Sequence, residues 1–303
     1  MAIIRKTLCA LGLSVAATVV AAEPITVTYP QLADNDRRYD YPLDVLELAL
    51  TKAGLDYTLA PKPEPASHQR MATLMKEKGD WTVGFFGADP FYEDNLRPIY
   101  FPLYRGLLGN RIAIIHKDNA DRFDEIDTHN EFMALSICQG LGWGDTNILA
   151  AAGFNLVKSN YENLFKMTHA KRCDAYTRAV FEPYAEVEGH AAELPNLMVD
   201  DSILIRYRLA FLMDVDPSQE ELAQAIERGL NIAMEDGSFQ ALFEAAPTIA
   251  EAKSKVNDSA RTCIEVANPF MSDALRAIPD EYWNGFNFGD SGEDAAGCHL
   301  ISS

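Results

Sequence analysis

Positive charge is scarce in this sequence. Its 303 residues include 26 Lys and Arg against 45 Asp and Glu, which gives a formal net charge of -19. A surface of this sign repels nucleic acids and anionic membranes, so we expect no nucleic-acid partner. After the first 22 residues the sequence also lacks an apolar run long enough to span a membrane. The partners that fit are a small molecule or another protein.

Signatures of catalysis and of metal binding are also missing. The six histidines form no HExxH or paired-ligand pattern, and His169 and Cys173 are too few ligands for a zinc site. The stretch GDSG at residues 289–292 is similar to a serine-protease nucleophile loop, but Glu293 follows it and no upstream histidine has the matching context. The glycines of QGLGWGDTN do not have GxGxxG spacing. We therefore expect no enzymatic activity, no cofactor and no metal.

The one long apolar run lies at the start of the chain. Two basic residues precede an apolar stretch from Leu8 to Val20, and small residues then lead to Glu23. This layout predicts a secretory signal peptide at residues 1–22, cleaved after Ala22. A transmembrane anchor is the alternative, but the run is shorter than the roughly 20 residues of a membrane span. We expect a soluble protein exported to the periplasm.

Four cysteines follow the predicted cleavage site: Cys138, Cys173, Cys263 and Cys298. An even number in an exported protein predicts two disulfides, although the sequence alone does not fix which cysteines pair. We expect Cys138 to pair with Cys173 and Cys263 with Cys298, since each pair closes a loop within one region of the chain.

Strand and helix patterns alternate at the beginning of the predicted mature chain. The strand-like stretch ITVTYP precedes PLDVLELALTKAG, whose apolar residues recur at helical spacing. A second strand, LDYTLA, a helix, SHQRMATLMKEKG, and a third strand, WTVGFFG, follow. A βαβαβ unit of this kind predicts a parallel sheet with ligand sites beyond the carboxyl ends of its strands. Tyr29 and Phe86 lie at such ends, where they either line a pocket or pack in the core.

The alternation starts again after the stretch RIAIIHK. The strands ALSIC, NLVKS and CDAYTR enclose two helical segments, and a strand, YRLAFLM, and a long helix come later. The pattern predicts a two-lobed α/β protein with mostly parallel sheets. We place lobe 1 at residues 23–117 and 206–262, lobe 2 at 118–205, and a C-terminal extension at 263–303 on lobe 1. The chain would cross between the lobes twice, near residues 115 and 208.

Four stretches after the predicted signal peptide carry a resemblance: ITVTYP, DRRYDYPLDVLELALTKAG, LRPIYFPLYRGLLGNRIAIIHK and IERGLNIAMEDGSFQALFE. In this order they resemble the family 3 extracellular solute-binding proteins, the amino-acid-type periplasmic binding proteins of ABC importers, in a divergent subgroup. The resemblance implies a flytrap of the type II architecture that closes on a small polar solute, anionic or zwitterionic, and delivers it to a membrane permease. We expect a monomer. Two alternatives stay open: a flytrap that reports its ligand to a membrane receptor, and a periplasmic enzyme on the same fold.

Arginines of the stretch RPIYFPLYRGLLGNR are the first candidate ligand residues. Arg97 matches the family arginine that clamps a ligand carboxylate, a task suited to a forked guanidinium. The alternative for Arg97 is a surface ion pair with Glu93 or Asp94. Arg105 and Arg111 flank the expected entry to lobe 2, where they either face the cleft or hold the hinge.

Two stretches of lobe 2 supply the remaining candidates. The stretch QGLGWGDTN follows a strand and opens a helix, which suits an anionic or polar ligand group. CDAYTRAVFE lies at a corresponding strand end, and it has Ala179 where the family places an aspartate for the ligand amine. Glu182 is the nearest acid after it, although it also suits the first turn of a following helix. From these two stretches the candidates are Trp143, Asp145, Thr146, Tyr176, Arg178 and Glu182.

Overall fold

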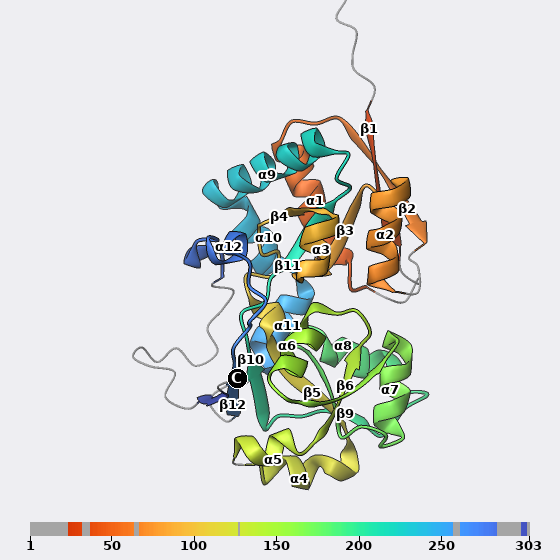
Figure 1. Cartoon of the computed structure of the whole chain (residues 1–303), viewed down its shortest axis with the longest axis vertical. Coiled ribbons are helices and arrows are strands. Elements are labelled where there is room, and N and C mark those ends of the chain that lie inside the picture. The colour runs from red at the N-terminus through yellow and green to blue at the C-terminus, as the bar shows by residue number, and fades with distance from the viewer. Residues whose placement is uncertain are drawn as a thin grey trace, which may run out of the picture.

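The computed structural model describes residues 24–31, 37–63, 67–126, 128–256 and 261–283, together with the backbone of 298–301. The predicted signal peptide at 1–22 and the GDSG stretch lie outside these ranges. Within them, no helix has the length and apolar character that crossing a membrane requires. Two lobes stand one above the other in Figure 1.

The upper lobe contains the elements that the alternating pattern predicts. In chain order these are β1 (Ile25–Gln31), α1 (Asp40–Lys52), β2 (Tyr57–Pro63), α2 (His68–Lys78), β3 (Val83–Gly87), α3 (Pro90–Asn95) and β4 (Arg97–Ile99). Strands β1 and β2 pair in parallel. Strand β3 lies beside β1, and the backbone N–H of Thr82, just before β3, donates a hydrogen bond to the Thr28 carbonyl oxygen of β1 at 3.0 Å. The later strand β11 (Phe211–Val215) pairs antiparallel with both β3 and β4.

The lower lobe is built on one larger sheet. Its elements are β5 (Asn110–His116), α4 (Ala120–Asp124), α5 (His129–Met133), β6 (Ser136–Gly140), α6 (Gly144–Ala151), β7 (Asn155–Ser159), α7 (Tyr161–His169), β8 (Ala175–Ala179), α8 (Pro183–His190), β9 (Leu197–Val199) and β10 (Ile203–Arg206). Two later strands, β12 (Thr262–Val266) and β13 (Cys298–Ile301), join this sheet. The strand order is β13-β12-β10-β5-β8-β6-β7, with β9 also paired to β5. Pairing is parallel except around β5, so the α/β class with mostly parallel sheets is confirmed.

The chain returns to the upper lobe through β11 and continues as α9 (Glu220–Glu235) and α10 (Ser238–Ala245). Helix α9 packs along α1, and the approach requires glycine at position 229. A Cβ there would lie 1.9 Å from the carbonyl oxygen of Ala49. Seven buried small or apolar residues of α9 face this contact and the core. The apolar face of this amphipathic helix is therefore the face that packs against α1 and the core.

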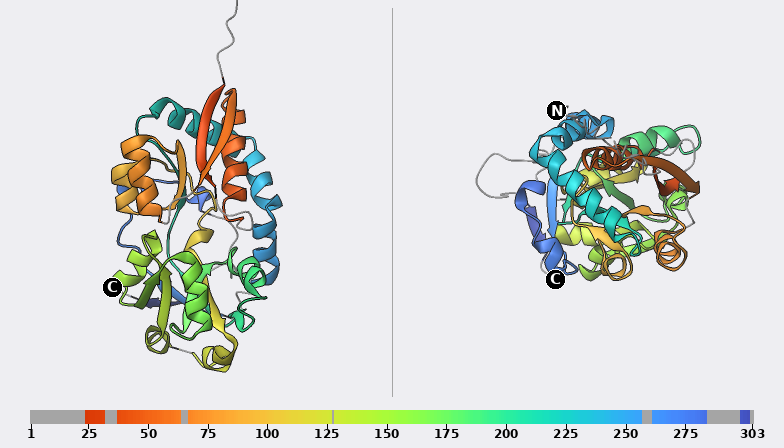
Figure 2. Two further views of the ribbon diagram at one scale, coloured as in Figure 1. Left: turned by 90° about the vertical axis from the view of Figure 1, so that its right-hand side faces the viewer. Right: turned by 90° about the horizontal axis from the view of Figure 1, so that it is seen from above.

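The C-terminal part of the chain differs from its predicted position. We placed residues 263–303 on lobe 1, whereas β12 (Thr262–Val266) pairs with β10 and β13 (Cys298–Ile301) pairs with β12 in the lower sheet. Strand β10 leaves one backbone edge open, and the β-branched stretch TCIEV covers it. Strand β5, which we gave to lobe 1, also belongs to this sheet. Helix α11 (Pro247–Lys255) leads from α10 down to it, so the chain crosses between the lobes more than twice (Figure 2).

One predicted disulfide is present in the lower lobe. Cys138 on β6 and Cys173, just before β8, are bonded, with their Cα atoms 5.7 Å apart. Both side chains are buried. The backbone register sets Cys263 opposite Cys298, but the Cys298 side chain lies outside the described residues. The second disulfide stays a prediction.

We expect the double substitution Cys138→Ala and Cys173→Ala to lower the free energy of unfolding by about 3 to 4 kcal/mol. The bond closes a loop with a sequence separation of 35 residues, and releasing it returns that loop's conformational entropy to the unfolded chain. Urea denaturation followed by circular dichroism measures the change. The reference is the oxidised wild-type chain, and equal stability of the two proteins would contradict the expectation.

Candidate functional site

A cavity of about 1290 Å³ lies between the lobes. The upper lobe contributes the segment before α1, the exposed side of α1, and His68 at the start of α2. The lower lobe contributes the beginning of α6, helix α7, the end of β8 and helix α8. Helix α11 forms part of one side with Thr248 and Glu251. Two segments that link the lobes, residues 100–109 and 207–210, are called the first and second crossing segments below.

The lobes touch each other beside the cavity. Tyr92 of α3 donates a hydrogen bond to the carbonyl oxygen of Gly142 at 2.6 Å. Asn147 of α6 donates one to Asp89 at 2.7 Å. Gly144 packs so closely against the upper lobe that a Cβ there would lie 2.7 Å from the Ala88 carbonyl oxygen. The cavity is therefore the space that is left when the lobes are in contact.

Arg38 brings the two lobes together at a second place. Its guanidinium carbon lies 3.9 Å from the ring centroid of Tyr161, the first residue of α7. Arg38 precedes α1 in the upper lobe, and both residues line the cavity. A cation over a tyrosine ring is attracted by the negative face of the ring. This contact joins elements of opposite lobes and places positive charge in the cavity wall.

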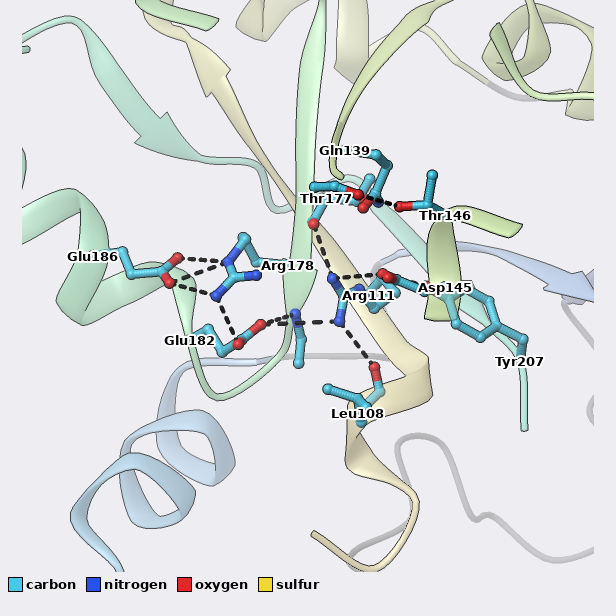
Figure 3. Close-up of polar contacts among 12 residues, drawn as sticks. Leu108, Arg111, Gln139, Asp145, Thr146, Thr177, Arg178, Glu182, Glu186 and Tyr207 are labelled. Carbon is cyan, nitrogen blue, oxygen red and sulfur yellow. Dashed lines mark hydrogen bonds and ion pairs between the residues drawn. The ribbon is translucent and has the colours of Figure 1, made fainter. Parts of the chain in front are cut away.

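A buried guanidinium occupies the middle of the lower wall. Arg178 of β8 is 3% exposed, and its Nη2 atom lies 2.6 Å from carboxylate oxygens of both Glu182 and Glu186 (Figure 3). Burial alone would lower the pKa of Arg178, but the two carboxylates raise it well above its ordinary value. Burial raises the pKa of Glu182, and Arg178 opposes this shift.

Aromatic rings surround the same guanidinium. The Arg178 carbon lies 5.0 Å from the ring of Trp143, 5.4 Å from that of Tyr176 and 5.5 Å from that of Tyr161. Three rings and two carboxylates around a cation make a cage suited to a guanidinium or ammonium group. The chain's own arginine fills this cage.

Arg111, at the beginning of β5, holds the crossing segments to the lower lobe. Its Nη2 atom lies 2.9 Å from Asp145 and donates to the Thr177 carbonyl oxygen at 3.1 Å. Its Nη1 atom donates to the Leu108 carbonyl oxygen at 3.1 Å (Figure 3). Tyr207 of the second crossing segment donates to Asp145 at 3.2 Å. Arg111 both lines the cavity and fixes the hinge, so the two alternatives left by the sequence are combined in one residue.

Arg97 lies elsewhere. It begins β4 opposite Val215, the last residue of β11, whereas the first residue of β11, Phe211, lines the cavity. Arg97 is therefore at the end of the sheet away from the cavity, where it pairs with Glu220 at 2.9 Å and Glu227 at 3.0 Å. Arg97 therefore forms surface ion pairs, as the alternative prediction held, but its partners are carboxylates of α9 and not Glu93 or Asp94.

Arg105 also lies outside the cavity lining. It donates hydrogen bonds to Gln240 and, at 2.7 Å, to the Glu281 carbonyl oxygen. Its φ of 49° is in the left-handed region, which is unfavourable for a residue with a long side chain. Its position in the first crossing segment fits the hinge alternative.

The other predicted residues divide into two groups. Trp143, Asp145, Arg178 and Glu182 line the cavity. The remaining four do not: Phe86 stacks on Tyr92, Thr146 donates to the Gly140 carbonyl oxygen, Tyr176 is fully buried, and Tyr29 is half-buried at the end of β1. Four further residues that line the cavity were not predicted from the sequence: Arg38, His68, Tyr161 and Glu186. Arg38 had a usable signal, because it stands in the polar segment after the first predicted strand.

Acidic side chains predominate in the cavity lining. Nine Asp and Glu residues line it, against five Lys and Arg. The exposed side of α1 supplies Asp44 and Glu47, and the segment after α8 supplies Glu193. Burial, Glu47 and Asp40 raise the pKa of Asp44. Within the described ranges, no three His, Cys, Asp or Glu side chains are placed to hold a metal ion.

His68 lines the cavity and has a strongly lowered pKa. Burial, Arg38 and Arg178 lower the pKa of this imidazole from 6.5 to about 3. The ring packs edge-on against Phe86, with centroids 5.5 Å apart. His68 is therefore neutral at physiological pH and contributes no charge to the cavity.

We expect acid to destabilise the protein partly through His68. The pKa of His68 in the folded protein, about 3, is below its ordinary value of 6.5. Between these two pH values the imidazole is protonated in the unfolded chain but not in the folded one, so acid favours unfolding. The resulting loss between pH 7 and pH 5 is about 2 kcal/mol. His68→Gln removes this part of the loss, as urea denaturation at both pH values would measure. If wild type and variant lost equal stability, His68 would not be the responsible group.

Comparisons with known proteins are informative only at the level of structure. No family model matches the chain, and no curated protein matches it. An ancestral arginine-binding protein bound to arginine is 15% identical, with a TM-score of 0.53 over 72% of this chain and 96% of that one. A substrate-binding protein of an amino acid ABC transporter from Streptococcus pneumoniae, bound to L-arginine, is 14% identical, with a TM-score of 0.52 over 76% and 94%.

A third similar structure belongs to a signalling protein. It is a histidine kinase sensor domain with similarity to periplasmic binding proteins, 14% identical, with a TM-score of 0.51 over 73% of this chain and 94% of that one. Identities this low establish the fold and not the ligand. The chain has the two-lobed fold of the amino-acid-type solute-binding proteins, as the sequence resemblance implied.

Proposed function

We propose that this protein binds a small zwitterionic solute in the cavity between its lobes, outside the cytoplasmic membrane. One observation carries the proposal: two lobes in direct contact enclose a large cavity whose wall presents both guanidinium and carboxylate groups. Closure of two lobes around a ligand is a common mode of solute capture. The predicted signal peptide at residues 1–22 supports the location.

The charge of the cavity favours a zwitterion over a simple anion. Arg111 and Arg178 are neutralised by buried carboxylates. Arg38 lies over the Tyr161 ring in the cavity wall, and we propose that its guanidinium contacts a ligand carboxylate. Asp44, Glu47 and other acids of the lining then attract a ligand amine. In a cleft with low-dielectric walls, such a field concentrates ligands of opposite charge. Two of the similar proteins are bound to arginine, a zwitterion with a second cationic group.

We propose uptake as the purpose of binding. The closed form would be recognised by a membrane permease, as the resemblance to the binding proteins of ABC importers implies, and the protein would act as a monomer. Sensing is the second candidate, favoured by the similarity to a histidine kinase sensor domain. Neighbouring genes discriminate the two roles, because a permease and an ATPase support uptake, whereas a receptor supports sensing.

Binding without a reaction fits the groups in the cavity. Arg178 is held by Glu182 and Glu186, Arg111 is held by Asp145, and His68 is kept neutral by its surroundings. None of these pairs leaves a base poised beside an activated nucleophile. Turnover in a metabolite screen would support an enzyme on the same fold instead.

We expect a thermal-shift screen to identify zwitterions that carry an additional amine. A ligand present at 100 times its dissociation constant stabilises the protein by about 2.7 kcal/mol. Amino acids with cationic side chains should raise the melting temperature, and dicarboxylates should not. No shift with any amino acid, small carboxylate or amine would contradict the proposed function.

Two variants then locate the site. Arg38→Ala removes the guanidinium that faces the cavity and is expected to weaken binding at least tenfold, about 1.4 kcal/mol, in calorimetry. Arg97→Ala is the matched control, since Arg97 pairs with carboxylates of α9 at the other end of the sheet. Equal weakening by both variants, or by Arg97→Ala alone, would overturn the placement of the ligand.

A further inference from the structure

A C-terminal segment lies along both crossing segments. Residues 267–283, which we call the strap, follow β12 and contain α12 (Asp273–Arg276) and a 3-10 helix (Asp280–Tyr282). Figure 1 shows the strap leaving β12 in the lower lobe and reaching α12 beside α10 in the upper lobe. Met271, Leu275 and Ile278 of the strap are buried, so it is packed against the molecule along its length.

The strap packs against the first crossing segment and is hydrogen-bonded to it. Arg105 donates a hydrogen bond to the Glu281 carbonyl oxygen at 2.7 Å. At the next residue, a Cβ on Gly106 would lie 2.9 Å from the Trp283 carbonyl oxygen. The ring of Tyr282 meets that of Phe101 edge-on, with centroids 5.1 Å apart. Both Arg105 and Gly106 have positive φ, at 49° and 85°, so the strap covers the part of this segment with the most unusual backbone.

The strap also contacts the second crossing segment. The guanidinium of Arg208 lies 4.3 Å from the ring centroid of Trp283 and its Nη2 atom lies 3.2 Å from Asp280. The Asn268 side chain donates to the Arg208 carbonyl oxygen at 2.8 Å. Trp283 therefore touches both crossing segments, one through Gly106 and the other through Arg208.

We infer that the strap restrains the opening of the cleft. Domain closure depends on torsions of a few residues in the segments that link the lobes. Residues 100–109 and 207–210 are two of the segments that link the lobes here, and the strap, which itself runs from one lobe to the other, is bonded to both at once. Opening would have to twist both segments against the strap or detach it. The restraint on motion follows from these contacts alone, and its consequence for ligand exchange rests on the proposed function.

The restraint can be measured without a ligand. Glu77 of α2 and Lys158 of β7 are exposed residues of opposite lobes, and a p-acetylphenylalanine at each position accepts a spin label that does not react with cysteine. Double electron–electron resonance then reports the distance between the lobes. In the otherwise wild-type full-length chain we expect one narrow distance distribution.

Arg208→Ala combined with Trp283→Ala removes the ion pair and the cation–π contact between the strap and the second crossing segment, and it keeps the hydrogen bond from Asn268 to the backbone carbonyl of residue 208. An exposed ion pair and an exposed cation–π contact are each weak, so we expect the population at longer distances to rise about fivefold. Arg276→Ala is the matched control, because Arg276 lies in the strap and its ion-pair partner among the described residues is Asp273, at 3.6 Å. The control should keep the narrow distribution.

Two outcomes would overturn the inference: identical distributions for wild type and double variant, or the same broadening in Arg276→Ala. Unchanged far-UV circular dichroism shows that the variants are folded, and Arg208→Ala alone provides a milder test if the double variant is not. Because the measurement needs no ligand, a failed thermal-shift screen leaves its result intact. The spin-label distances therefore test the restraint, and the thermal-shift screen separately tests the proposed function.

Discussion

A guanidinium buried away from water has to keep acceptors within reach, and Arg111 finds them in three separate parts of the chain. Leu108 belongs to a crossing segment, Asp145 to the start of α6 and Thr177 to β8. Removing one partner of such a buried pair typically costs about 3 to 5 kcal/mol. The requirement fixes where β5 begins, how α6 meets β8 and how the first crossing segment enters the lower lobe. The wall of the cavity is built on this arrangement.

The fold could be largely predicted from the sequence because its signals are local. Helical spacing in α1, β-branched stretches in β1 and the amphipathic pattern of α9 each report on a few neighbouring residues. The pairing of Cys138 with Cys173 was also accessible, because both cysteines lie within one region. The position of β12 was not, since a short β-branched stretch does not reveal which strand edge it will cover.

The site was harder to predict because its contacts join distant parts of the chain. Arg97 meets Glu220 and Glu227 across separations of 123 and 130 residues, and nothing near Arg97 in the sequence indicates these partners. The contact between Arg38 and Tyr161 of the other lobe also joins residues that are far apart in the sequence, so it could not be predicted either. By contrast, Arg178, Glu182 and Glu186 are close in sequence, and the first two were identified from one stretch. Sequence reasoning succeeded where a strand end and the helix after it both face the cavity.

The course of the chain through the lower sheet has a consequence for biosynthesis. The sheet draws its strands from residues 110–206 and then from 262–266 and 298–301, with β11 and two upper-lobe helices synthesised in between. A growing polypeptide can complete the upper sheet well before the edge of β10 is covered. Until residues 262–266 emerge, that edge offers unpaired backbone groups to any other strand. The lower lobe thus depends on a strand that is synthesised after the upper lobe, and a fragment that ends before β12 would expose an edge prone to aggregation.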